Sequence, residues 1–121
     1  MHAVIETPSF LQDARVAGLS EQDRQVIIQT ISENPLAGDL MPGTGGARKL
    51  RFAAPGKGKR GGYRTVHYFA GNDVPIFLLA VLKKGERSDL SQAEKNTLRK
   101  ELGSLAADYR TSVKSALKRR R

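Results

Sequence analysis

Hydrophobic and polar positions in the first third of the chain predict one strand followed by two helices. Residues 2–6 contain two adjacent β-branched side chains, which favour a short strand. Thr7 suits a helix N-cap with Pro8 in the first turn, and apolar residues then recur at helical spacing until a glycine ends the pattern. A capping box that begins at Ser20 opens a second helical pattern, which we expect to end before Pro35.

The middle of the chain predicts three strands. Residues 48–52 alternate between apolar and polar side chains, with Lys49 and Arg51 on the polar face. Residues 62–70 form a second extended segment with two mixed faces. Residues 74–83 are almost entirely apolar, which is typical of a strand that is buried on both faces in the middle of a sheet.

The connections and the C-terminal pattern predict the fold class. The three strands are joined by short connections, so we expect an antiparallel meander with its first hairpin at residues 57–61. A capping box at residues 91–94 starts a long amphipathic helix. The element order predicts an α+β domain with helices on one face of a mostly antiparallel sheet. We assign residues 1–117 to one domain and residues 118–121 to a basic, solubilising tail.

Composition restricts the classes of function. The chain has 121 residues, a formal net charge of +9 and no cysteine. Without cysteine there is no disulfide, cysteine nucleophile or thiolate metal site, and with only two distant histidines we expect no metal or other cofactor. The longest apolar run is too short to span a membrane, so we expect a soluble cytoplasmic protein. The excess of positive charge favours a nucleic acid or an acidic protein as partner.

The cations are concentrated in a stretch that contains no carboxylate. Between Asp39 and Asp73 there is no acidic residue, and glycines are interspersed among the basic residues of this stretch. Glycine lets the backbone approach a phosphate closely, and cations gain energy by displacing counterions from a nucleic acid. The alternative is a solvated hairpin loop with no ligand. The basic residues of the stretch are Arg48, Lys49, Arg51, Lys57, Lys59, Arg60 and Arg64.

Several of these residues have side chains suited to phosphodiester chemistry. Cleavage of RNA by its own 2′-hydroxyl needs a base, cations for the developing charge, and an acid. Arg64 follows a glycine pair at the start of a strand, where its guanidinium fork suits a phosphate. Lys57 and Lys59 lie close to other cations, which lowers lysine pKa values and is one route to a lysine base. His67 is either a general acid or base or a structurally packed residue.

Two further groups extend the candidate site. Lys84 and Arg87 follow the apolar strand, and the register of the sheet decides whether they emerge at the same end as Arg64 or at the opposite end. Aromatic rings that stack on bases are a common means of reading single-stranded RNA. The residues expected to contact RNA in addition to the catalytic candidates are Arg48, Arg51, Arg60 and Tyr63.

The motifs taken in order resemble a known family. Residues 45–52 (GGARKLRF), 56–68 (GKGKRGGYRTVHY) and 78–91 (LLAVLKKGERSDLS) look like the RelE/ParE toxin superfamily, specifically its HigB-like branch. The resemblance implies a toxin of a type II toxin–antitoxin system that enters the ribosomal decoding site and cleaves messenger RNA. It also implies an antitoxin, usually a helix-turn-helix protein in this branch, with operator DNA bound only through the toxin–antitoxin complex.

The resemblance also assigns roles to residues. The lysines of the family's central loop correspond to Lys57 and Lys59, and its phosphate-binding arginine corresponds to Arg64. The later basic residue of the family corresponds to Lys84 or Arg87. Some members have a tyrosine after the Glu-Arg-Ser segment, where this chain has leucine and serine. A lysine or a histidine must then replace that tyrosine as the base, or positioning and charge neutralisation supply most of the rate.

Three functional hypotheses follow from the sequence. The first is a metal-independent, ribosome-dependent endoribonuclease that arrests translation. The second is a non-enzymatic ParE-like inhibitor of DNA gyrase, which does not depend on a cationic phosphate site and is disfavoured by the density of lysine and arginine. The third is a basic nucleic-acid-binding module, which predicts salt-sensitive binding without cleavage.

Overall fold

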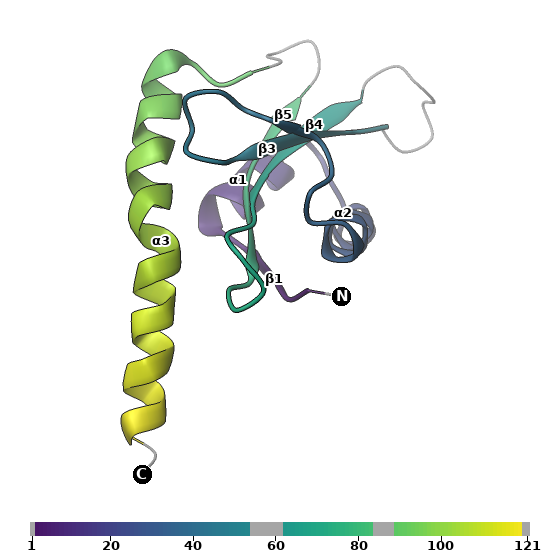
Figure 1. Ribbon diagram of the computed structural model, residues 1–121. Helices are drawn as coiled ribbons and strands as arrows, with labels where there is room; N and C mark the ends of the chain where they lie inside the picture. Colours follow the sequence, from purple (N-terminus) through teal and green to yellow (C-terminus); the bar gives the residue numbers. More distant parts are fainter. Residues whose placement is uncertain (1, 54–61, 84–88, 120–121) are drawn as a thin grey trace.

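The computed structural model describes residues 2–53, 62–83 and 89–119, with only the backbone described at residue 119 (Figure 1). The expected hairpin at residues 57–61 and the basic residues at 84–88 lie outside the described residues, as do residues 120 and 121. Three helices and a five-stranded sheet make up this part of the chain. The helices are α1 (Pro8–Val16), α2 (Glu21–Glu33) and α3 (Gln92–Arg119). The strands are β1 (Val4–Glu6), β2 (Asp39–Leu40), β3 (Arg48–Phe52), β4 (Tyr63–Tyr68) and β5 (Ile76–Lys83).

The sheet has the strand order β1-β5-β4-β3-β2. The strands β3, β4 and β5 pair antiparallel in sequence order, so the expected meander is confirmed. The N-terminal strand β1 pairs parallel to β5, and the two-residue strand β2 extends the other edge of the sheet. The sequence did not predict β2, because a strand of this length has no measurable periodicity.

The helices begin where side-chain chemistry satisfies their first backbone N–H groups. The Thr7 hydroxyl accepts from the Phe10 N–H at 3.3 Å, and Ser20 forms the expected reciprocal capping box. At the start of α3, the Ser91 hydroxyl accepts from the Glu94 N–H at 3.1 Å and the Glu94 carboxylate accepts from the Ser91 N–H at 2.9 Å. All three helix starts predicted from the sequence are therefore confirmed.

The helices lie on both faces of the sheet, so the expectation that they share one face is wrong (Figure 1). On one face, Phe10 of α1 and Ile27 of α2 form a fully buried cluster with Leu78 of β5. On the other face, Leu102 of α3 packs with Leu82 of β5 in a separate cluster. Each fully buried large apolar side chain contributes about 1.5–3 kcal/mol relative to exposure. The alternating faces of β4 and β5 both need covering, which is why one helical layer is not enough.

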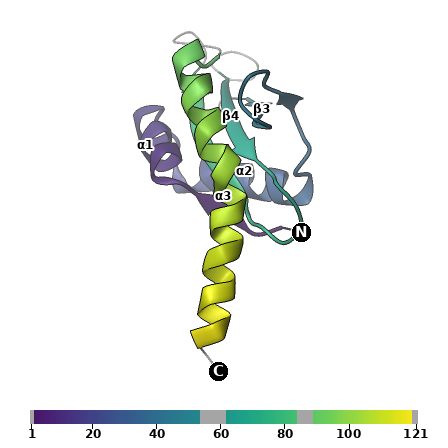
Figure 2. The same cartoon turned by 60° about the vertical axis from the view of Figure 1, so that its left-hand side comes forward.

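Helix α3 is longer than the sheet that it covers. Its N-terminal half packs on the sheet, and its C-terminal end projects beyond it (Figure 2). The helix continues through Arg119, so the first two residues of the expected tail are helical. None of the described helices is long and apolar enough to cross a membrane.

Candidate functional site

Two arginines lie directly opposite each other on neighbouring strands. Arg51 of β3 pairs in register with Arg64 of β4, and opposite residues in a sheet share a face. That face is the α3 side, because Val66, two residues after Arg64, packs in the cluster that contains Leu102 of α3. Arg51 is exposed and Arg64 is half-buried. The predicted polar face of residues 48–52 is therefore confirmed, with Arg51 on it.

Neither arginine is neutralised by the part of the chain that the structure describes. No ion pair or side-chain hydrogen bond joins either guanidinium to a residue within 2–53, 62–83 or 89–119. Like charges placed directly opposite across a strand pair are destabilising. The pair therefore works against folding and is suited to an anion that bridges the two forks.

One described carboxylate on this side forms ion pairs with two lysines. Asp89, which lies just before α3, forms ion pairs with Lys49 of β3 at 3.7 Å and with Lys95 of α3 at 3.3 Å. Desolvation raises the pKa of Asp89, but the hydrogen bonds from the Leu90 N–H and Lys95, with the charges of both lysines, outweigh it and lower the pKa. Asp89 thus stays ionised and ties the start of α3 to the sheet.

The described residues next to both undescribed segments lie at the arginine end of the sheet. Residues 54–61 connect the end of β3 to the start of β4, so their flanks adjoin Arg51 and Arg64. Residues 84–88 follow Lys83, whose register partner is Tyr63, the residue before Arg64. The described flanks of both basic segments therefore share one end of the sheet, and the position of Lys84 and Arg87 themselves stays a prediction. The candidates Lys57, Lys59, Arg60, Lys84 and Arg87 lie outside the described residues.

The opposite face of the same strands uses its polar residues for structure. Arg48 donates from Nη1 to the carbonyl oxygens of Leu36 and Gly38, at 3.0 and 3.3 Å. His67, its register partner on β4, is fully buried and has Nε2 at 2.9 Å from the Pro35 carbonyl oxygen. These contacts hold the segment between α2 and β2 against the sheet.

The surroundings of His67 favour its neutral form. Burial lowers its pKa, the hydrogen bond to the Pro35 carbonyl opposes this, and the charge of Arg48 lowers the pKa further. Because a carbonyl only accepts, Nε2 carries the proton, and the buried Nδ1 has no hydrogen-bond partner in the structure. We call the sheet face that carries Arg51 and Arg64 the arginine face. His67 reaches neither this face nor solvent.

Tyr63, expected to stack on bases, lies in the core on the α1 and α2 side. The residue is 5 % exposed, and its ring stacks on Phe52 with centroids 5.7 Å apart and planes 11° apart. Burial raises the pKa of its hydroxyl, and the charge of Asp23 adds to this. Stacking on a base stays a prediction for Tyr63, and the structure places its ring against protein.

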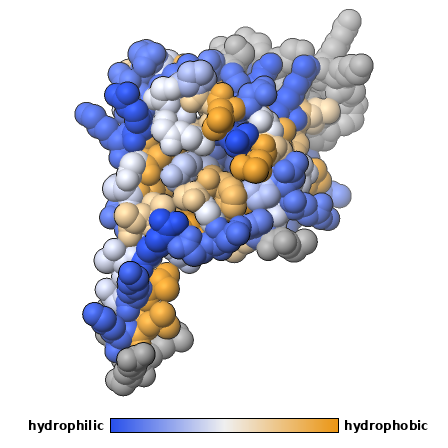
Figure 3. Space-filling model, in the orientation of Figure 1, coloured by the Kyte–Doolittle hydropathy of each residue, from blue (hydrophilic) through white to orange (hydrophobic). Residues whose placement is uncertain are grey.

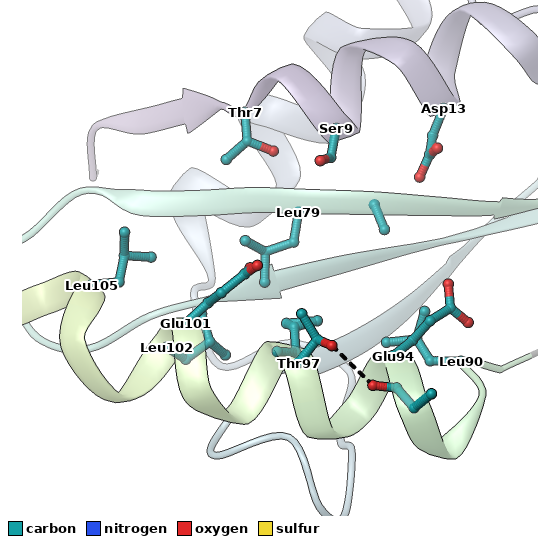
Figure 4. A pocket seen from close by; sticks show the side chains of 13 residues that line it. Thr7, Ser9, Asp13, Leu79, Leu90, Glu94, Thr97, Glu101, Leu102 and Leu105 are labelled. Carbon is teal, nitrogen blue, oxygen red and sulfur yellow. Dashed lines mark hydrogen bonds between the residues drawn. The ribbon is translucent and has the colours of Figure 1, made fainter.

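A groove of about 540 Å³ lies between α1 and α3, across β5. Figure 4 shows side chains from the two helices facing each other over this strand. Its charged lining residues are the carboxylates Asp13, Glu94 and Glu101, and Asp13 accepts from the Val81 N–H at 3.1 Å. None of the described residues that line it is a lysine or an arginine. An acidic groove repels phosphate, so the nucleic-acid candidate is the face that carries Arg51 and Arg64, and not this groove.

The site residues proposed from the sequence did not include Lys49 or Asp89, which belong to this face. Alternation places Lys49 on the same face as Arg51 and places Arg48 on the other, so that signal was present for Lys49. No local signal identifies Asp89, since its ion pair with β3 depends on how α3 docks. Among the described residues, no group of three or more histidines and carboxylates could hold a metal ion.

Comparisons with known proteins agree with this fold. A family model described as the RelE toxin of the RelE/RelB toxin–antitoxin system matches residues 2–120. A solved structure of a mutant of the E. coli toxin RelE in the free state is similar, with a TM-score of 0.50 and 18% sequence identity. That similarity covers 70% of this chain and 85% of the E. coli chain, and at this identity it concerns the fold. Membership of a toxin–antitoxin family implies a cognate antitoxin. The chain belongs to the RelE toxin family.

Proposed function

We propose that this toxin is a ribosome-dependent endoribonuclease that cleaves messenger RNA in the decoding site, with Arg51 and Arg64 holding the scissile phosphate. The observation that carries the proposal is a pair of guanidiniums on one sheet face that no residue in the described part of the chain neutralises. Two forks on adjacent strands offer several N–H donors to the oxygens of one phosphate, and strands fix such groups better than loops do. Charge that develops on the phosphorane is then stabilised by donors already in place.

The remaining cations of the proposal come from the two basic segments. Lys57 and Lys59 extend the phosphate site from the β3–β4 connection, and Lys84 or Arg87 extends it from the connection after β5. The common position of the described flanks supports this arrangement. Cytoplasmic localisation and independence from metal are part of the same proposal.

Proton transfer is assigned to a lysine and not to His67. His67 is fully buried on the opposite face, with Nε2 bonded to a backbone carbonyl. A lysine surrounded by other cations has a lowered pKa, which brings it closer to the range in which a base operates. We further propose that the antitoxin is a helix-turn-helix protein, as the HigB-like motifs imply.

Cleavage by purified ribosomes programmed with a defined messenger tests the proposal. We expect cleavage in the decoding site, mapped by primer extension, and we expect Arg64→Ala to lower its rate by about 100-fold or more. Arg64→Lys keeps the charge but loses the fork, so its loss should be smaller. Arg15→Ala, which removes an exposed arginine from α1, is the matched control and should retain activity.

Four results would contradict the proposal. Intact messenger after incubation with the folded wild-type protein would exclude the reaction. Full activity of a folded Arg64→Ala variant would exclude the site. Inhibition of DNA gyrase supercoiling without messenger cleavage would favour a ParE-like inhibitor, and salt-sensitive RNA binding without either activity would favour a simple binding module.

A further inference from the structure

The projecting end of α3 is a helix without a protein layer beneath it. The last described tie between α3 and the sheet end is Arg110, which donates to both oxygens of Asp73 at 2.6 and 2.8 Å. All side chains of residues 111–118 are exposed. At about 1.5 Å per residue, the helix continues for roughly 13 Å beyond Arg110. We define residues 111–119 as the overhang.

The apolar stripe of α3 continues onto the overhang. Tyr109 packs edge-on against Phe77 of β5, with ring centroids 6.4 Å apart, and belongs to the core. Val113 and Leu117 follow at four-residue intervals and so lie on the same side of the helix as Tyr109. They are 40 % and 59 % exposed. Figure 3 shows hydrophobic side chains along one side of the projecting end of α3.

Cations accompany the stripe along one flank. Lys114 and Lys118 each follow a stripe residue directly, so they lie about 100° around the helix from it. The side chains of both lysines and of Leu117 border a shallow hollow of about 440 Å³. The overhang contains no carboxylate, because its residues are TSVKSALKR. An occupant therefore meets an apolar ridge with positive charge beside it.

This combination selects among possible occupants. A nucleic acid would pair with the lysines but would gain nothing from covering Val113 and Leu117. A second copy of the chain would match the apolar ridge but would bring Lys114 and Lys118 towards identical charges. An amphipathic helix with acidic flanks satisfies both features, because helices recognise apolar faces through residues at this spacing.

We propose that the overhang of α3 is a docking surface for an acidic amphipathic helix of a partner protein. Val113 and Leu117 are its apolar anchors, and Lys114 and Lys118 select carboxylates on the partner. The inference is independent of the chemistry proposed for the arginine face. The overhang lies at the other end of the molecule from the β3–β4 pair, so both surfaces can be occupied together (Figure 1).

A designed peptide tests the docking surface directly. The probe is a fluorescent helix of about 20 residues, long enough to be helical, with leucines on one face and glutamates on the other. Its partner probe has lysine in place of every glutamate. Fluorescence anisotropy with the full chain at about 150 mM salt should detect binding of the acidic probe and much weaker binding of the basic probe.

Matched variants then locate the binding. Val113→Ser with Leu117→Ser should weaken binding of the acidic probe by about tenfold or more, because both anchors are lost. Lys114→Glu with Lys118→Glu should also weaken it. Val26→Ser with Leu36→Ser changes the same residue types at positions that are 54 % and 60 % exposed elsewhere, and it should leave binding unchanged. Circular dichroism checks that each variant is folded.

Several outcomes would overturn the inference. Equal binding of the acidic and basic probes would show that charge does not select the partner. Equal binding of the acidic probe to the Val113→Ser, Leu117→Ser variant and to the Val26→Ser, Leu36→Ser variant would show that the probe does not bind at the overhang. Displacement of the probe by a single-stranded RNA at equal concentration would assign the overhang to nucleic acid. Self-association in sedimentation velocity that is lost in the Val113→Ser, Leu117→Ser variant would assign it to a second copy.

Discussion

The two faces of the β3–β4 pair differ in how they use basic residues. On the α3 side, Arg51 and Arg64 lie opposite each other with no ion pair to the residues that the structure describes. On the other side, Arg48 is bonded to two loop carbonyls and His67 to the carbonyl of Pro35. The same two strands thus carry one polar pair that is bonded to backbone carbonyls and one pair that forms no ion pair with the described residues.

This difference separates basic residues with a structural role from basic residues that are candidates for binding a ligand. Groups that are bonded to the backbone stabilise the fold, and their chemistry is already committed. Like charges that lie opposite each other on neighbouring strands lower stability. Such local conflicts are expected at functional sites. Residue type alone does not separate Arg48 from Arg51, whereas the face on which each lies does.

The largest expected effect comes from turning the repelling pair into an attracting one. Arg51→Glu places a carboxylate opposite Arg64, so the free energy of unfolding should rise by about 0.2–1 kcal/mol. The same change neutralises the phosphate site, so ribosome-dependent cleavage should fall by about 100-fold or more. Urea unfolding and primer extension measure the two effects.

Arg51→Gln is the control, because it removes the charge without adding the opposite one. Its stability and its activity should both lie between those of the wild type and Arg51→Glu. Cleavage at the wild-type rate by a folded Arg51→Glu variant would show that the arginine pair is not the phosphate site, and the two faces would then not differ in function.

Much of this fold was predictable because its signals are local. The capping residues Thr7, Ser20 and Ser91 marked the helix starts, and alternation gave the bounds of β3 without error. The parallel pairing of β1 with β5 and the placement of α3 on its own face were not predictable, because they depend on contacts between distant segments. The whole-chain resemblance to the RelE superfamily was confirmed.

The candidate site was predictable only in part. Alternation within β3 placed Arg51 correctly and also identified the face of Lys49. The burial of His67 and Tyr63 was not evident, since both faces of β4 carry buried residues and periodicity gives no sign of which polar side chains are enclosed. The roles of the lysines at 57 and 59 stay predictions, because those residues lie outside the described part of the chain.

A second, smaller effect concerns the face that carries Arg48 and His67, and the dependence of stability on pH. The pKa of His67 is lower in the folded protein than its ordinary value of 6.5, so the unfolded chain binds a proton first as the pH falls. The stabilisation is therefore complete above about pH 6.5 and is lost as the pH falls towards the pKa of the folded state. Between about pH 7.5 and pH 5.5 we expect the free energy of unfolding to fall, by no more than about 1.4 kcal/mol per pH unit because a single group titrates.

The variant His67→Gln isolates this contribution. A glutamine keeps an N–H donor for the Pro35 carbonyl but does not titrate, so urea unfolding should show a shallower pH dependence than in the wild type. Messenger cleavage per folded molecule should be unchanged. An identical pH dependence in both proteins would show that His67 is not the titrating group.

The smallest expected effect tests the border of the arginine face. Asp89→Asn removes the negative charge that lies 3.7 Å from Lys49 but keeps an oxygen to accept from the Leu90 N–H. Because Asp89 is about half exposed, its ion pairs contribute at most about 1 kcal/mol to stability, and the variant should fold normally.

Binding of single-stranded RNA should tighten by a factor of about two or three and depend slightly more steeply on salt, since the net charge of this face rises by one. Fluorescence anisotropy at several salt concentrations measures both quantities. Weaker binding would instead mean that Asp89 positions Lys49 for RNA, and the two faces would then differ less than their contacts indicate.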